Sequence, residues 1–307
     1  MKEIDIAVIG SGIGGSLIAS LNKDKDLVLF EKDKNLGGCA STFKRFGGYY
    51  NAGATTFVGY ENNHPIKRIF DKIGFIPDIV ESKIAIRTIQ NRKIVDRVQN
   101  FEEFLSQLNS VYYHKNNRVF WKTIKDIDER FWSLKNIYYA KYSIKAYTKT
   151  AFFILELMKS FKFDLLKSAD FFINQTLPNI SKEYKAFIDA QLLITLQTTS
   201  KDLSLLSMAL GLAYPFHKVF YPNGGMGKII DDLLKDINVY NKEEIISIQK
   251  ENKKYRLITT KDEYIASKVI LNSAVFESSK LFIDEDIKKY YDKFSFSDQS
   301  AFVVYLK

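Results

Sequence analysis

The sequence is poor in the residues that form disulfides and metal sites. Cys39 is the only cysteine among 307 residues, which excludes a disulfide framework and indicates a protein of the reducing cytoplasm. His64, His114 and His217 are far apart in the sequence and show no ligand spacing, so the sequence gives no support to a metal site. No Ser/His/Asp set or pair of carboxylates stands out, and we name no catalytic residue.

Long apolar runs are absent as well. No stretch reaches the roughly 18 to 20 apolar residues that a membrane-spanning helix needs. Glu3 and Asp5 replace the basic start of a signal peptide, so we expect none. With 46% hydrophobic and 26% charged residues, the composition predicts a soluble globular protein, and 307 residues suit two domains.

The formal charge of +9 is compatible with nucleic acid, an anionic membrane surface or an anionic ligand. The lysines are spread along the chain without a basic tail, as on an ordinary solvated surface. We therefore expect no nucleic-acid partner and leave contact with a membrane open.

What the sequence does contain is a glycine-rich turn near its start. Residues 4–9 are an apolar, largely β-branched run typical of a buried parallel strand, and GSGIGG at 10–15 follows directly. Gly10 allows a tight turn, Gly12 lets a pyrophosphate approach the backbone, and Gly15 lets the next helix pack closely on the strand.

We expect that helix to run from about Gly14 to Leu21, with Leu17, Ile18 and Leu21 facing the sheet. Its first N–H groups and its dipole would face the phosphates.

A second strand at 27–30 ends at Glu31, which lies 21 residues after Gly10. A carboxylate there accepts a hydrogen bond from a ribose 2′-OH and repels a 2′-phosphate. The order of strand, turn, helix, strand and acid predicts a site for an adenine dinucleotide rather than a turn without ligand. Glu31 argues against NADP and fits NAD and FAD equally.

The continuation favours FAD. Gly37-Gly38, Gly47-Gly48 and Gly53 follow within 22 residues of Glu31. A plain NAD domain does not need them, whereas a flavoprotein chain passes close to the ribityl chain and the isoalloxazine, where only small residues fit.

These residues resemble the phytoene desaturase and carotenoid desaturase–isomerase branch of the FAD-dependent amine oxidase superfamily. The resemblance rests on the opening motif, on GGCASTFKRFGGYYNAGATTFVG at 37–59 and on YPNGGMGKIIDDL at 221–233. It is looser at 243–274, where a strand near Ile245 would pass the adenine and another would end at Asn272. QSAFVVYLK at 299–307 resembles a later strand of the substrate domain.

The resemblance implies an α/β fold of the GR2 flavoprotein type: a Rossmann-like FAD/NAD(P)-binding domain with an inserted α+β substrate domain. We place the FAD domain at 1–60 and 215–280, and the substrate domain, which can also face a membrane, at 61–214 and 281–307. Motif and resemblance together predict these FAD-binding residues: Gly10, Gly12, Ile13, Gly14, Gly15, Glu31, Lys32, Gly37, Gly38, Cys39, Ala40, Gly53, Ala54, Ile245 and Asn272.

Two features leave alternatives. Cys39 lies where the chain should pass the flavin, and a small buried side chain is favoured there over a redox-active thiol. The family also continues with a further Gly-rich FAD-binding segment, and nothing after Asn272 resembles it. We therefore expect an incomplete or split polypeptide, which leaves the catalytic competence of this chain open.

Residues 61–220 are rich in aromatics and nearly free of glycine. The spacing predicts helices at 66–73, 101–108 and 181–197, and strands at 84–88 and 92–96. The stretch 147–173 combines apolar residues with Lys149, Lys159, Lys162 and Lys167. It is either an interfacial helix on the inner face of a membrane or a core helix with a solvated lysine face.

The resulting hypothesis is an FAD-dependent oxidoreductase that transfers hydride between an apolar polyene or isoprenoid and flavin N5. Desaturation, isomerisation and saturation are not separated. A flavin amine oxidase acting on another substrate is the second enzyme reading, and a non-catalytic FAD- or lipid-binding fragment is the third.

Overall fold

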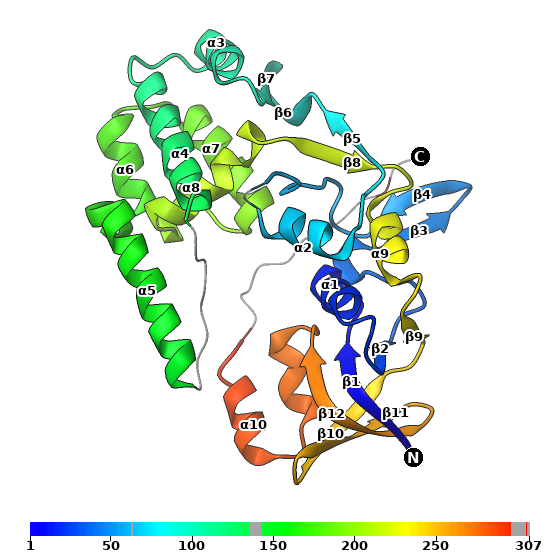
Figure 1. Ribbon diagram of the computed structural model, residues 1–307. Helices are drawn as coiled ribbons and strands as arrows, with labels where there is room; N and C mark the ends of the chain where they lie inside the picture. Colours follow the sequence, from blue (N-terminus) through cyan, green and yellow to red (C-terminus); the bar gives the residue numbers. More distant parts are fainter. Residues whose placement is uncertain (63, 135–142, 296–304, 306–307) are drawn as a thin grey trace. The chain divides into compact units, whose positions relative to one another are not determined.

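The computed structural model describes residues 1–62, 64–134, 143–295 and 305 (Figure 1). The chain divides into two compact units. The first unit comprises 1–57, 65–81 and 220–307, and the second comprises 58–64 and 82–219.

The first unit is built on a six-stranded sheet with the order β10-β11-β12-β1-β2-β9. Four of its strands are parallel: β1 (Lys2–Ile9), β2 (Leu27–Glu31), β9 (Asn238–Asn241) and β12 (Glu263–Leu271). The antiparallel strands β10 (Ile245–Glu251) and β11 (Lys254–Thr259) extend the sheet beyond β12. All five residues of β2 are buried, which is the pattern of a central parallel strand.

Helices and two-stranded sheets accompany the six-stranded sheet in this unit. The helical elements are α1 (Ile13–Leu21), η1 (Gly38–Ala40), α2 (Pro65–Ile73), α9 (Met226–Leu234), η5 (Val275–Leu281) and α10 (Glu285–Tyr291). The strand pairs are β3 (Thr42–Arg45) with β4 (Gly48–Asn51), and β5 (Ile79–Ser82) with β8 (Val219–Pro222). Ser20 Oγ donates to the carbonyl of Leu233 at 2.8 Å and so joins α1 to α9.

The second unit is mainly helical. Its elements are β6 (Ile84–Gln90), β7 (Lys93–Val98), α3 (Phe101–Val111), α4 (Asn117–Trp132), α5 (Ile144–Phe161), η2 (Lys162–Leu166), α6 (Ala169–Thr176), α7 (Lys182–Leu196), η3 (Ser200–Asp202), α8 (Leu205–Ala213) and η4 (Tyr214–Phe216). Side-chain N-caps fix where several helices begin. Ser143, Ser168, Ser181 and Ser204 each accept the N–H three residues later. None of the helices in the described part of the chain is long and apolar enough to cross a membrane.

The core of the second unit encloses a charged side chain, Arg97 of β7. It is completely buried, and its guanidinium lies over the rings of Phe104 at 4.4 Å and Trp121 at 4.6 Å. It donates to Gln191 Oε1 and, at 2.6 Å, to the carbonyl of Leu212. Burial lowers the pKa of Arg97 to about 9. Arg97 therefore joins β7 to α7 and α8.

The units differ from the predicted domains by a few residues at the boundaries, because 58–60 and 215–219 belong to the second unit, and by two longer segments. Residues 65–81 and the chain after 280 belong to the first unit, not to the substrate domain. In the first case Phe70 of α2 stacks on Phe57 with ring centroids 5.9 Å apart. In the second, Ile283 N donates to the carbonyl of Ile248 at 3.0 Å, which ties the segment after η5 to β10. The predicted strand at 299–307 lies outside the described residues except for Tyr305.

Replacing Arg97 should destabilise the second unit much more than replacing a surface arginine on the same hairpin. Arg97→Ala leaves a cavity and removes the partners of Gln191 and Leu212, so we expect a loss of about 3–5 kcal/mol in the free energy of unfolding. Arg87→Ala is the control, because the Arg87 side chain in the ion pair with Asp96 is exposed. We expect this substitution to lower the free energy of unfolding by less than about 1 kcal/mol. Both tryptophans, Trp121 and Trp132, lie in the second unit, so urea unfolding followed by tryptophan fluorescence reports on it. Equal losses in the two variants would contradict the assigned role.

Candidate functional site

The ends of three parallel strands meet at one edge of the first unit's sheet. Gly10 N donates to the carbonyl of Phe30 at 2.8 Å, and Asn272 N donates to the carbonyl of Ile9 at 2.8 Å. The turn after β1, the acidic end of β2 and the residue after β12 therefore lie side by side. In open α/β sheets, this carboxyl edge is where ligands bind.

The glycines of the turn at 10–15 meet different constraints. Gly10 has φ +96°, and a Cβ there would lie 2.8 Å from the carbonyl oxygen of Asn272. A Cβ on Gly15 would lie 2.1 Å from the carbonyl oxygen of Gly10. The backbone thus requires these two glycines with or without a ligand. On Gly12 and Gly14 a Cβ would meet the Asn272 carboxamide, at 2.9 Å and 2.6 Å, so that side chain lies over the turn.

The helix after the turn begins one residue earlier than predicted, at Ile13. Leu17 is buried as expected, whereas Ile18 and Leu21 are only partly buried. The N-cap position is Gly12, and no side chain among the described residues caps α1. The N–H groups of the first turn and the positive end of the helix dipole can therefore serve an anionic group.

Glu31 holds this edge together. Its side chain is 7% exposed, and Oε2 accepts hydrogen bonds from Ser11 N at 2.9 Å and from Ser11 Oγ at 2.5 Å. Oε1 accepts from Asp33 N at 3.0 Å. Ser11 Oγ in turn accepts from Gly37 N at 2.8 Å. A carboxylate offers about four acceptor positions, so one on Oε1 remains for a ribose hydroxyl.

The second glycine pair forms a tight turn next to this network. Gly37 and Gly38 have φ +106° and +55°. The carbonyl of Cys39 accepts Ala54 N at 2.9 Å, and a Cβ on Gly53 would approach that carbonyl to 3.1 Å. Residues 37–40, which end at the buried Ala40, and 53–54 are therefore neighbours. The Cys39 side chain is exposed, so the expectation that it is a small buried side chain was wrong.

The remaining predicted residues lie around this edge in different ways. Lys32 follows Glu31 and is exposed. Ile245 begins β10 and is buried. Glu243 N donates to the carbonyl of Glu31 at 3.0 Å, so the chain that leads to Ile245 passes Glu31.

The PNGGMG segment at 222–227 has a packing role. Asn51 Oδ1 accepts Met226 N at 3.0 Å, and Thr42 Oγ1 accepts Gly227 N at 2.8 Å, so β3 and β4 cap the start of α9. A Cβ on Gly225 or Gly227 would come within 2.6 Å of Thr42. The motif therefore allows α9 to approach the hairpin closely.

The residues at this edge fit an adenine dinucleotide. The first turn of α1 offers N–H groups to a pyrophosphate, and Glu31 retains an acceptor for a ribose. The glycine turns keep side chains away from both positions, and a shift of the Asn272 carboxamide is the one adjustment at the turn.

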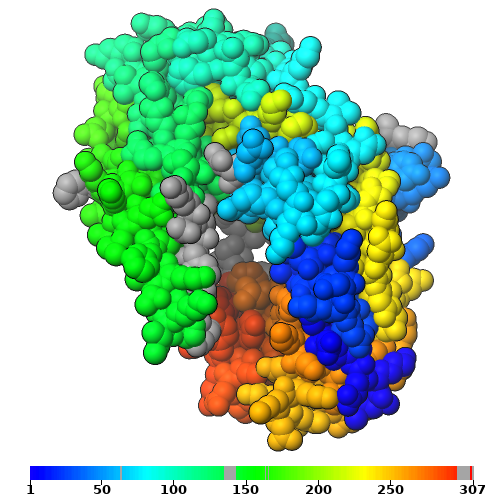
Figure 2. Space-filling view, in the orientation of Figure 1, coloured from blue at the N-terminus to red at the C-terminus, as the bar shows by residue number. Residues whose placement is uncertain are grey.

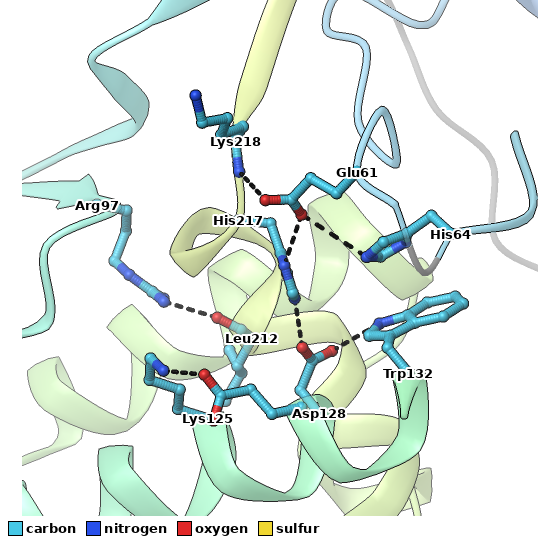
Figure 3. Close-up of polar contacts among 10 residues, drawn as sticks. Glu61, His64, Arg97, Lys125, Asp128, Trp132, Leu212, His217 and Lys218 are labelled. Atoms are coloured by element: carbon cyan, nitrogen blue, oxygen red, sulfur yellow. Dashed lines mark hydrogen bonds and ion pairs between the residues drawn. The ribbon is translucent and has the colours of Figure 1, made fainter. Parts of the chain in front are cut away.

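A second polar cluster lies in the second unit and was not predicted from the sequence. We call Glu61, His64, Asp128 and His217 the His–carboxylate cluster (Figure 3). His217 lies between the two carboxylates, with Nδ1 2.8 Å from Glu61 Oε2 and Nε2 2.5 Å from Asp128 Oδ2. Glu61 and His64 are three residues apart, which is the only signal that the sequence contained. The fold brings His217 and Asp128 to them.

The pKa values of the two histidines are shifted in opposite directions. Burial by itself lowers the pKa of His217, but the hydrogen bond to Asp128 and the attraction of both carboxylates outweigh it and raise the pKa. Burial, followed by repulsion from His217, lowers the pKa of His64.

Comparisons with known proteins agree with the architecture of the first unit. A family model described as an NAD(P)-binding Rossmann-like domain matches residues 8–73. The chain is 23% identical over 324 residues to the chloroplastic prolycopene isomerase of Daucus carota, covering 95% of this chain and 50% of that one. It is 26% identical over 142 residues to the all-trans-retinol 13,14-reductase of Danio rerio, covering 43% of this chain and 23% of that one.

Among solved structures, an oxidoreductase from Methanosarcina mazei superposes with a TM-score of 0.65 at 18% identity, covering 94% of this chain and 64% of that one. The chain has the fold of the FAD-dependent oxidoreductases. It spans half the length of the carrot protein and about a quarter of the zebrafish protein. The fold class predicted from the sequence is thereby confirmed.

Neutralising Glu31 should weaken dinucleotide binding. In Glu31→Gln an amide NH₂ takes the place of one acceptor oxygen, so Asp33 N or the ribose hydroxyl loses its acceptor. The hydrogen bonds that remain are weaker because their acceptor is no longer a charged carboxylate. We expect a loss of about 1.5–3 kcal/mol, which raises the Kd for FAD about 10- to 150-fold in a calorimetric titration. Asp33→Asn changes an exposed neighbouring carboxylate in the same way and should leave the Kd within a factor of about two. Equal Kd values in both variants would remove Glu31 from the site.

Proposed function

We propose that this chain binds FAD at the carboxyl edge of its six-stranded sheet and forms part of an oxidoreductase for an apolar polyene or isoprenoid. The observation that carries the cofactor assignment is the buried Glu31 carboxylate. It is bonded to Ser11 in the first glycine turn and, through Ser11, to Gly37 in the second. FAD, when bound, supplies a hydride acceptor or donor.

The chain's own groups hold and orient such a cofactor. The first turn of α1 receives the pyrophosphate, and the free acceptor on Glu31 Oε1 receives a ribose hydroxyl. The buried charge of Glu31 also disfavours a 2′-phosphate, which argues against NADP. Gly37, Gly38 and Gly53 keep the adjoining backbone free of side chains, as the ribityl chain and flavin require.

The substrate class rests on the relatives. Prolycopene isomerase and all-trans-retinol 13,14-reductase are both named for conjugated isoprenoids, and this chain resembles both. A polyene substrate demands apolar walls more than a dedicated acid or base. An amine oxidase reaction and a non-catalytic FAD-binding role are the alternatives that the experiments below distinguish.

A peripheral contact with an anionic membrane would suit such a substrate, and α5 provides the surface that we assign to it. Six residues that recur at helical spacing form one apolar stripe along α5, and the large side chains among them are exposed. The stripe consists of Ile144, Tyr147, Ala151, Ile154, Leu155 and Met158. Lys145 and Lys159 are exposed beside the stripe, and the net charge is +9. Helix α5 is on the face shown in Figure 2 (green, lower left). Exposed apolar residues flanked by lysines are typical of interfacial helices.

The purified chain should show the visible absorption of bound flavin, and heat denaturation should release FAD. Anaerobic addition of a conjugated isoprenoid, such as a retinoid or an acyclic carotene, or of its more saturated product, should then change the flavin spectrum between its oxidised and reduced forms. Bound FAD that no isoprenoid changes, but that an amine reduces, would favour the amine oxidase reading. Bound FAD that neither class changes would favour the non-catalytic reading, and failure to bind added FAD would overturn the proposal.

Charge in the stripe of α5 should weaken membrane binding. Leu155→Glu and Met158→Glu each place a carboxylate where lipid chains and anionic head groups would lie, so we expect at least about a tenfold loss of binding to phosphatidylserine-containing liposomes in a flotation assay. Ile89→Glu makes the same change at another exposed apolar position of the second unit and serves as the control. If all three variants bind like the unchanged chain, α5 is not the contact.

A further inference from the structure

We propose that Glu61, His64 and His217 form a binding site for one divalent transition-metal ion, for which Zn²⁺ is the best fit. This site lies within the second unit and is independent of the proposed FAD site. The ligand atoms of the three residues all lie within 4.8 Å of one another. Two imidazoles and one carboxylate are a ligand set that zinc uses in proteins, with the fourth position taken by water.

The distances between the ligand atoms are compatible with a bound metal ion. Tetrahedral ligands at zinc bond lengths lie about 3.3 Å from each other. Glu61 Oε2 is 2.8 Å from His217 Nδ1 and 3.7 Å from His64 Nε2, on either side of that value. The three ligand atoms all lie within 4.8 Å of one another, so binding of one ion would draw them closer together.

The carboxylate oxygen at the centre of the cluster faces both imidazoles, with His217 Nδ1 at 2.8 Å and His64 Nε2 at 3.7 Å. Glu61 Oε2 is buried and has no hydrogen-bond donor among the described residues, although Glu61 Oε1 accepts Lys218 N at 3.4 Å. The contact with His217 Nδ1 is close but not aligned as a hydrogen bond. A buried carboxylate oxygen that faces two imidazoles is a position where a cation would be held by all three groups.

Asp128 completes the arrangement from outside. Its Oδ2 contacts His217 Nε2, and its Oδ1 accepts the indole N–H of Trp132 at 3.1 Å (Figure 3). A metal-binding histidine usually donates its second ring N–H to such a carboxylate, which fixes its tautomer and leaves the other nitrogen for the metal. The Asp128 side chain is 3% exposed, so the carboxylate that orients the His217 ring lies on the buried face of α4.

The surroundings hold the ligands in place. His64 stacks near Trp132 with ring centroids 4.2 Å apart, and His64 N donates to the carbonyl of Glu61 at 2.9 Å. His217 N donates to the carbonyl of Tyr214. A bound ion would therefore link the segment 58–64 directly to the segment after η4 and, through Asp128, to α4.

The test is a titration of the tag-free, chelator-treated full-length chain with Zn²⁺, followed by calorimetry and by elemental analysis after gel filtration. We expect one ion per chain with a Kd below about 1 μM and a rise in the unfolding temperature. Replacement by Co²⁺ should give the visible absorption of tetrahedral nitrogen–oxygen coordination.

His217→Ala and Glu61→Gln should each raise the Kd more than about 100-fold, and Asp128→Asn, which acts through His217, about 10- to 100-fold. Glu61→Gln removes little volume and guards against a result that only reflects misfolding of His217→Ala. His114→Ala alters the third histidine, outside the cluster, and should bind like the unchanged chain. Binding weaker than about 10 μM, or equal binding in Glu61→Gln, His217→Ala and His114→Ala, would overturn the site.

Discussion

The buried carboxylate of Glu31 is the interaction on which the proposed cofactor site depends. It accepts both donors of Ser11 and thereby holds the first glycine turn against the end of β2. Through Ser11 Oγ it also places Gly37, and with it the second glycine turn. A residue that the dinucleotide motif assigns to the ribose therefore also builds the edge of the sheet. Its remaining acceptor is positioned by the same bonds that make the charge tolerable when buried.

The second unit uses charge in its interior in a different way. Arg97 is enclosed by aromatic rings and satisfies Gln191 and a carbonyl of α8, so it connects a hairpin to two helices. The His–carboxylate cluster connects a loop, the end of η4 and α4. In both places a polar group joins segments that are distant in the sequence, which is a common way for buried polar groups to specify one arrangement of a core.

Local sequence patterns predicted most elements near the glycine turn. The run at 4–9, the turn at 10–15 and the apolar strand that ends at Glu31 predicted β1, α1 and β2, because steric freedom at glycine and burial of β-branched residues act over a few neighbours. The helices at 101–108 and 181–197 were predicted from the periodicity of their apolar residues, which is also a local feature of the sequence. The environment of Cys39 did not follow, because exposure depends on what the rest of the chain covers.

The sequence by itself determined that a dinucleotide-type turn joins β1 to α1 and that an acidic residue closes β2, since both are local features with fixed spacing. Only the tertiary structure decided that Asn272 lies over that turn and that the chain after 280 packs with the first unit. The tertiary structure alone also brought His217 and Asp128 to Glu61 and His64. Asp128 and His217 are 89 residues apart in the sequence, and His64 and His217 are more than 150 residues apart. Contacts of that range depend on how helices pack, and no periodicity or motif in the sequence encodes them.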